Sequence, residues 1–213
     1  NNPAVTKAIQ EQAAKIIHAS NLVEIQQQVD LGDVLANLFG ADSEVFFNNS
    51  GAEAIETAIK IARLYGHSKQ IANPKILVMH GAFHGRTIAA ITAGDNQKSK
   101  EGFDPLLPGF IRVAYDNPAA IETALKADPE IVAVLLEPIQ GESGIRVPNQ
   151  NYLSQIRNIC DDTQTLMMLD EVQSGMARTG KFFCFEHASI QPDVVTLAKG
   201  LANGVPIGAC IIR

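Results

Sequence analysis

A lysine with the character of a chemical nucleophile follows one of the apolar runs of this sequence. Lys199 comes directly after DVVTLA (193–198) and is flanked by the small residues Ala198 and Gly200. We expect partial desolvation of its amine there, which would lower its pKa and make it nucleophilic. The plainer alternative is a lysine whose charged end reaches solvent where a strand ends, and Lys199 alone does not decide between the two.

An acidic residue follows a second apolar run. Asp170 ends TLMMLD (165–170), and a carboxylate left unpaired after a buried strand costs free energy. One interpretation is an Asp170–Glu171 pair that holds magnesium beside a nucleotide, but the chain has no G-x-x-x-x-G-K-[ST] loop. The G-x-G-x-x-G turn of dinucleotide-binding folds is also absent from the sequence. The remaining interpretation is that Asp170 pairs with a cationic ligand group, such as a protonated pyridine nitrogen.

A small turn follows the run EVFFN (44–48) and leads into a predicted helix. Ser50, Gly51 and Ala52 would let backbone N–H groups approach an anion closely at the positive end of the helix. The Ser50 hydroxyl would add a further donor. This turn is a candidate phosphate cup. Ser50 acting only as the helix cap is the alternative.

Two further loops carry candidate ligand contacts. In GAFHGRT (81–87), Phe83 could lie flat on a planar ring and Arg86 could clamp a carboxylate. Phe83 in the core and Arg86 on the surface are the alternatives, and for His84 we favour packing or hydrogen bonding. The run IVAVLLEP (131–138) leads into a glycine-rich loop with Glu142, which is either functional or part of a polar rim.

The elements that must position these residues alternate between strands and helices. Predicted strands are 44–48, 75–80, 110–115, 131–138, 165–170, 193–198 and 207–212, and predicted helices are 3–19, 30–39, 50–66, 117–127 and 149–161. Continuous apolar strands separated by helices predict an α/β fold, a three-layer α-β-α sandwich around a mostly parallel seven-stranded sheet. Ligands of such folds bind beyond the carboxyl ends of the strands. A phosphate cup, a ring-stacking Phe, a pyridine-pairing Asp and an imine-forming Lys at those ends would together hold one molecule, pyridoxal phosphate.

The bulk properties exclude several classes of function. The 213 residues carry a net charge of −6 without a basic stretch, so we expect neither nucleic acid nor membrane as a partner. No apolar run is long enough to cross a bilayer. The three cysteines form no C-x-x-C pair and the histidines have no metal-ligand spacing. We therefore expect reduced thiols, no metal site and a cytoplasmic protein.

Five segments carry a resemblance to a known family. They are NNSGAEAIETAIKIAR, GAFHGRT, LLEPIQGESG, LMMLDEVQSGMARTGKFF and PDVVTLAKGLANGVPIGA. Together they resemble the class III aminotransferases, enzymes of pyridoxal-phosphate fold type I, nearly from end to end. The LDEVQSG and LAKGLANGVPIGA blocks are the most specific.

The resemblance implies a role for each matched residue. For the cofactor, pyridoxal 5'-phosphate, the catalytic residues would be Lys199, which forms the Schiff base, and Asp170, which pairs with the ring nitrogen. The resemblance also implies the remaining cofactor contacts. Ser50, Gly51 and Ala52 would bind the phosphate, and Phe83 and Val172 would pack on the two faces of the ring. Gln173 would contact the ring hydroxyl.

The resemblance also implies two substrate residues and an assembly. Arg86 would bind the α-carboxylate of the substrate, and Glu142 resembles the residue that masks or frees a positively charged site as the substrate changes. Residues 1–40 would form an N-terminal helical segment and 41–213 the cofactor-binding large domain, with the small C-terminal domain of the family absent from this chain. Family members form homodimers whose sites use both subunits, so we expect this chain alone to be inactive.

The implied reaction moves the terminal amino group of N-acetylornithine, a step of arginine biosynthesis, to 2-oxoglutarate. The family motifs leave other donors open, namely ornithine, 4-aminobutyrate and succinyldiaminopimelate, and also an aminomutase reaction. A third possibility is an inactive large-domain fragment that keeps the sheet but does not hold the cofactor.

Overall fold

The computed structural model describes residues 1–40 and 42–213, and the chain divides into two compact units, Asn1–Val45 and Phe46–Arg213. The first unit contains α1 (Pro3–Ala13) and α2 (Gln26–Phe39). Asn2 caps α1 by accepting a hydrogen bond from Ala4 N at 2.9 Å. The predicted large domain begins at residue 41, which lies outside the described residues, so its boundary stays a prediction.

The prediction of a helix over residues 3–19 is wrong at its carboxyl end, because α1 stops at Ala13. No residue of α1 is buried, and Ile16 and Ile17 beyond it are 51% and 89% exposed. Most helical stability comes from packing an apolar face. Without such packing the periodic sequence does not extend the helix.

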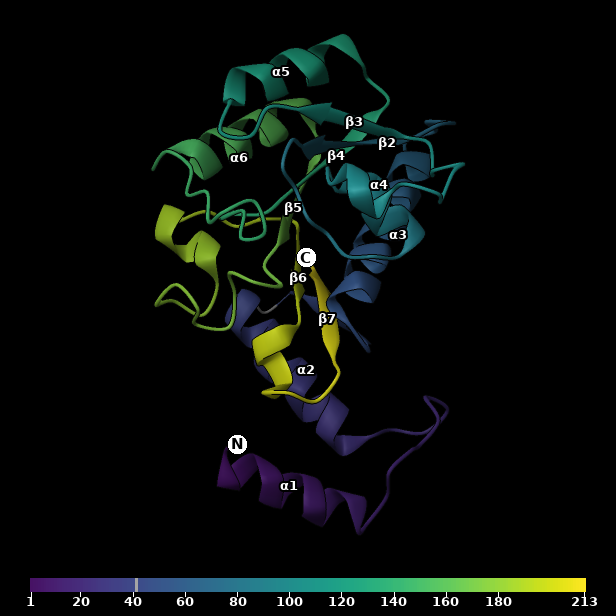
Figure 1. The fold of residues 1–213 in the computed structure, drawn as a ribbon, viewed down its shortest axis with the longest axis vertical. Helices are drawn as coiled ribbons and strands as arrows, with labels where there is room; N and C mark the ends of the chain where they lie inside the picture. Colours follow the sequence, from purple (N-terminus) through teal and green to yellow (C-terminus); the bar gives the residue numbers. More distant parts are fainter. Residues whose placement is uncertain (41) are drawn as a thin grey trace. The chain divides into compact units, whose positions relative to one another are not determined.

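The chain contains one seven-stranded sheet with the order β1-β7-β6-β5-β4-β2-β3, and all of it except the first two residues of β1 belongs to the second unit (Figure 1). The strands are β1 (Glu44–Asn48), β2 (Lys75–Met79), β3 (Phe110–Val113), β4 (Ile131–Leu136), β5 (Leu166–Asp170), β6 (Val194–Leu197) and β7 (Gly208–Ile212). The pairs from β3 through β2, β4 and β5 to β6 are parallel, and β7 runs antiparallel to β6. The predicted α/β fold with a mostly parallel seven-stranded sheet is confirmed.

Helices cover both faces of this sheet (Figure 1). On one face, α3 (Gly51–Ser68) and α4 (Ile88–Ala93) pack on alternate strand residues such as Val78 and Met168. On the other, Tyr152 at the start of α6 (Tyr152–Thr163) contacts Met79, and α5 (Pro118–Ala127) packs beside α6. The central strands are buried on both faces, which explains their continuous apolar sequences.

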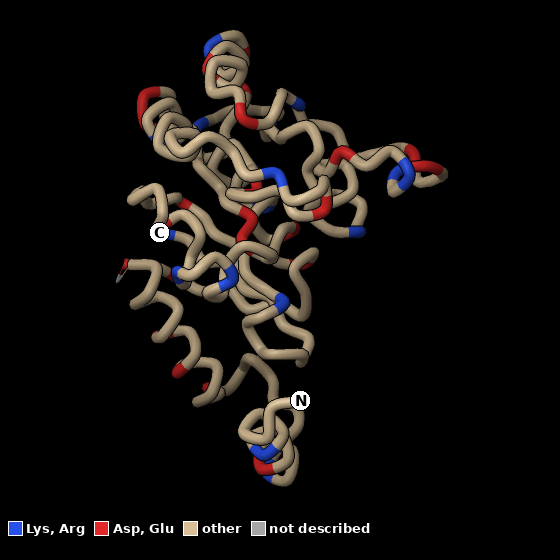
Figure 2. Tube along the Cα trace, turned by 60° about the vertical axis from the view of Figure 1, so that its left-hand side comes forward, with Lys and Arg blue, Asp and Glu red and all other residues tan. Residues whose placement is uncertain are grey.

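Short helical turns complete the described chain. They are η1 (Gln97–Ser99), η2 (Cys184–Ala188) and η3 (Lys199–Ala202). Among the residues that the structure describes, no helix combines the length and apolar character that a membrane span requires. Acidic and basic positions are interspersed along the traced chain (Figure 2).

Candidate functional site

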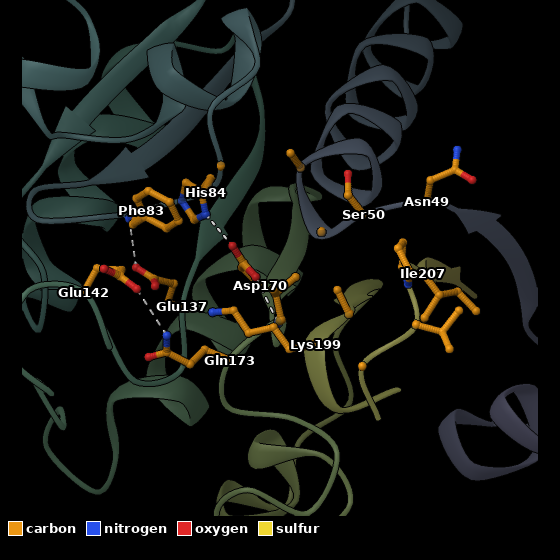
Figure 3. A pocket seen from close by; sticks show the side chains of 18 residues that line it. Asn49, Ser50, Phe83, His84, Glu137, Glu142, Asp170, Gln173, Lys199 and Ile207 are labelled. Carbon is orange, nitrogen blue, oxygen red and sulfur yellow. Dashed lines mark hydrogen bonds and ion pairs between the residues drawn. The ribbon is translucent and has the colours of Figure 1, made fainter. Parts of the chain in front are cut away.

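The carboxyl ends of the parallel strands border a cavity of about 450 Å³. Most of the residues predicted for the site line it, although they come from distant parts of the sequence (Figure 3). These are Ser50, Gly51, Ala52, Phe83, Glu142, Asp170, Val172, Gln173 and Lys199. The volume lies in the range of small-molecule sites.

The Ser50 turn forms one wall of the cavity at the N-terminus of α3. Ser50 is the cap, since its Oγ accepts from Glu53 N at 3.2 Å, while Glu53 Oε2 accepts from Asn49 N at 2.6 Å. The first N–H groups of a helix have no intrahelical partners. At Gly51 and Ala52 these groups border the cavity, so the turn serves both as a cap and as a potential anion site.

Two close packing contacts hold this turn in place. A Cβ at Gly208 on β7 would stand 2.2 Å from the Ser50 carbonyl oxygen. Gly85, whose φ is +127°, would bring a Cβ to 2.8 Å from Ala52 Cβ. Only glycine fits at both positions, so β7 and the loop after β2 pack directly against the Ser50 turn.

Asp170 ends β5 and is almost completely buried. Its Oδ2 lies 2.7 Å from His84 Nδ1, and its Oδ1 accepts from Val172 N at 3.0 Å. Burial disfavours the charged imidazole, but the hydrogen bond to Asp170 and its attraction outweigh this, so the pKa of His84 lies above its usual value. Asp170 therefore faces the cavity while its Oδ2 is held by the buried ring of His84. His84 therefore makes a buried hydrogen bond, as expected from the sequence.

Lys199 follows β6 and opens η3 at the mouth of the cavity. The expectation of a partly desolvated Lys199 is wrong for this chain, because the residue is exposed. The strand ends at Leu197, two residues before the lysine. Its φ of +45° is unusual for a residue with a side chain, and such strain is concentrated at functional positions.

Phe83 and Arg86 lie in the loop between β2 and α4. Phe83 is half-buried and lines the cavity, as its predicted contact with a ring requires. Arg86 is exposed and is not among the residues that line the cavity. Its guanidinium carbon lies 5.9 Å from the centroid of the Phe83 ring. The structure thus leaves Arg86 outside the cavity wall, and its binding of a substrate carboxylate stays a prediction.

Val172, Gln173 and Glu142 border the cavity on the side of β5. A Cβ at Gly51 would stand 2.8 Å from Val172 Cγ1, so this valine packs against the Ser50 turn. Gln173 Nε2 lies 3.5 Å from Glu142 Oε1, a long hydrogen bond between two loops. The expected exchange of partners by Glu142 stays a prediction.

Among the residues that line the cavity, Glu137 was given no role of its own from the sequence. Glu137 directly follows β4, is 5% exposed and accepts from Phe83 N at 3.2 Å. The same signal that pointed to Asp170, an acidic residue after a buried apolar strand, was present for Glu137. The cavity therefore offers a helix N-terminus, an aromatic wall, buried acidic side chains and a primary amine, a set that would suit a phosphorylated aromatic ligand.

Known proteins resemble this chain over its whole length. The family model of the class-III aminotransferases matches residues 1–213. Acetylornithine aminotransferase of Nitrosomonas europaea is 53% identical over 99% of this chain and 53% of that protein. The chain spans about half the length of the curated relatives that it matches.

Two solved structures have the same fold. N-acetylornithine aminotransferase of Stenotrophomonas maltophilia has a TM-score of 0.84 and 35% identity, covering all of this chain and 52% of its own. Ornithine aminotransferase of Toxoplasma gondii, with PLP at partial occupancy at its active site, has a TM-score of 0.94 and 35% identity. That match covers 99% of this chain and 50% of the Toxoplasma chain.

Proposed function

This chain belongs to the class III aminotransferase family, and from that premise we propose that its full-length protein is a pyridoxal 5'-phosphate-dependent transaminase. The proposed reaction transfers the terminal amino group of N-acetylornithine to 2-oxoglutarate, giving the corresponding aldehyde and glutamate. The observation that carries the proposal is that Asp170 and Lys199, at the ends of neighbouring strands, border one cavity with the Ser50 turn.

The residues of the cavity fit the proposed cofactor chemically. Gly51 and Ala52 present the start of α3 to an anion, as a phosphate group requires. Phe83 and Val172 provide apolar contacts for a planar ring. A ring nitrogen that carries a proton needs an anionic partner, and Asp170 is that partner.

Each reactive group of the chain has a proposed task. Lys199 Nζ would hold the cofactor through its aldehyde carbon and would move the proton at the substrate carbon. Asp170 would pair with the ring nitrogen, and His84 holds the Asp170 side chain in place. The cofactor supplies an electron sink for the negative charge that develops on the substrate.

The choice of N-acetylornithine over related donors rests on the relatives. The Nitrosomonas and Stenotrophomonas proteins are acetylornithine aminotransferases, but the similar Toxoplasma structure is an ornithine aminotransferase. We propose that Arg86 binds the α-carboxylate of the donor and that Glu142 exchanges partners between the two substrates. From the resemblance to the family we also propose that a second subunit completes the site in a homodimer. We place the protein in the cytoplasm, in keeping with three buried, unpaired cysteines.

Substrate profiling of the purified full-length protein tests this proposal. N-acetylornithine, ornithine, 4-aminobutyrate and succinyldiaminopimelate would each be supplied with 2-oxoglutarate, and the glutamate formed would be measured. We expect kcat/KM for N-acetylornithine to exceed the others by about tenfold or more. A higher kcat/KM for another donor would reassign the substrate within the family, and no glutamate with any donor would contradict the transaminase proposal.

A further inference from the structure

Glu137 is a buried acid of the site that the proposed chemistry does not use. It follows the last residue of β4, and the register pairs Leu136 of β4 with Leu169 of β5. The next residues along the two strands, Glu137 and Asp170, therefore stand at neighbouring strand ends. Both are 5% exposed, and both line the cavity.

The two carboxylates hold consecutive residues of one loop. Glu137 Oε2 accepts the backbone N–H of Phe83 at 3.2 Å, and Asp170 Oδ2 bonds the ring of His84 at 2.7 Å (Figure 3). A loop fixed at two successive residues by two successive strand ends has little freedom to rotate. The Glu137 bond acts on the backbone that carries the Phe83 ring.

The burial of Glu137 affects its protonation, but not its ability to accept the hydrogen bond from Phe83 N. Burial raises its pKa to about 7, against the opposing attraction of His84 and with added repulsion from Asp170. Near neutral pH the group therefore exists in both charged and neutral forms. Either form keeps an oxygen that can accept from Phe83 N. The hydrogen bond from Phe83 N therefore depends on the length of the Glu137 side chain and not on its charge.

We propose that Glu137 is a positioning residue that holds the Phe83 backbone and thereby sets the aromatic wall of the cofactor cavity. The inference rests on the proposed function, since it concerns how the cavity receives pyridoxal phosphate. Glu137 acts through Phe83 and has no assigned contact with the substrate.

A second buried glutamate of the chain provides a matched control. Glu171 is 1% exposed and accepts from Cys184 N at 2.6 Å and Phe185 N at 2.9 Å. Like Glu137, it is a buried carboxyl bonded to backbone N–H groups, but it is not among the residues that line the cavity. A change that only perturbs buried structure should have similar effects at both positions.

The test uses conservative variants of the full-length protein. Glu137→Gln keeps the length of the side chain and replaces the carboxyl group by an amide, whereas Glu137→Asp keeps the carboxyl group and withdraws its oxygen from Phe83 N. The measurements are the dissociation constant of pyridoxal phosphate, the circular dichroism band of the bound cofactor and the thermal midpoint of the cofactor-free protein. Glu171→Asp serves as the control.

We expect Glu137→Asp to weaken cofactor binding by about tenfold and to alter the dichroism band, because the shorter side chain no longer accepts the hydrogen bond from Phe83 N. Glu137→Gln should stay within about twofold of the parent protein, with its band unchanged. Glu171→Asp should lower the thermal midpoint but leave the band as it is. Equal effects of the two Glu137 variants, or an equally altered band in Glu171→Asp, would overturn the inference. A parent protein that does not bind pyridoxal phosphate would instead contradict the proposed function.

Discussion

His84 Nδ1 lies 2.7 Å from Asp170 Oδ2, and both side chains are almost completely excluded from solvent. The hydrogen bond and the attraction of Asp170 keep the pKa of His84 above its usual value despite burial. The pair places the Asp170 side chain at the cavity and fixes its orientation. A side chain held in this way is positioned to meet the ring nitrogen of the proposed cofactor.

His84→Phe tests this support. The variant leaves Asp170 without its imidazole partner, so we expect turnover to fall by about tenfold or more and stability by about 1–3 kcal/mol. Steady-state kinetics and thermal unfolding of the full-length protein measure the two effects. His80→Phe is the matched control, because His80 is exposed and its partner is Asp95. Equal losses in the two variants would mean that the His84 contact has no special role.

Asp170→Asn addresses the carboxylate itself. The amide is nearly the same size but carries no charge to hold a proton on the ring nitrogen. We expect the variant to bind the cofactor and lose about 10²–10³-fold in kcat, as for removal of one electrostatic contact to the transition state. Single-turnover kinetics with N-acetylornithine provides the measurement. Near-normal turnover would remove the proposed electron-sink role of Asp170.

Gly208→Ala tests the packing of the anion-binding turn. Its new Cβ would stand 2.2 Å from the Ser50 carbonyl oxygen, so the turn or β7 must shift. We expect about 1–3 kcal/mol of lost stability, as for other overpacked sites, and weaker cofactor binding. Gly102→Ala would meet no atom within 4 Å, although its φ is +81°. This control should lose some stability and keep its cofactor affinity; cofactor affinity unchanged in Gly208→Ala would contradict the proposed phosphate site.

The stability of the protein should depend on pH through Glu171. Burial raises the pKa of this carboxyl to about 7, from an ordinary value of 4.5. Between these values the folded state keeps a proton that the unfolded chain releases, so stability falls as pH rises through this window. Thermal midpoints of the parent protein and Glu171→Gln from about pH 5 to about pH 8 give the measurement, and the variant should fall less steeply. Glu122→Gln, on a helix position whose side chain is 45% exposed, should keep the parent slope. Parallel curves for the parent and Glu171→Gln would refute the assignment.

The sheet and most of the cavity could be predicted from the sequence, because both depend on strong local signals. Strands such as β4 are unbroken apolar runs, and chemistry-bearing residues such as Asp170 and Lys199 follow such runs directly. Because the carboxyl ends of parallel strands lie at the same edge of the sheet, residues that directly follow different strands come close together there. Pattern alone therefore brought residues more than a hundred positions apart into one predicted site.

What could not be predicted depends on packing between distant segments. Helix α4 has only six residues, which is too short for a helical period of apolar residues to be recognised in the sequence. Helix α1 is shorter than its apolar pattern predicts because none of its residues is buried. The exposure of Lys199 and the position of Arg86 depend on what covers each side chain in three dimensions. The bond from Phe83 N to Glu137 joins residues 54 positions apart and has no counterpart in sequence spacing.

The central claim, that Lys199 is the covalent anchor of pyridoxal phosphate, can be measured directly. The full-length protein would be loaded with the cofactor, reduced with borohydride to make the bond permanent, digested and analysed by peptide mass spectrometry. We predict that the added cofactor mass lies on the peptide that contains Lys199 and is absent from Lys199→Ala treated in the same way. Stable cofactor mass on another lysine, such as Lys181, or on no lysine at all, would contradict the account.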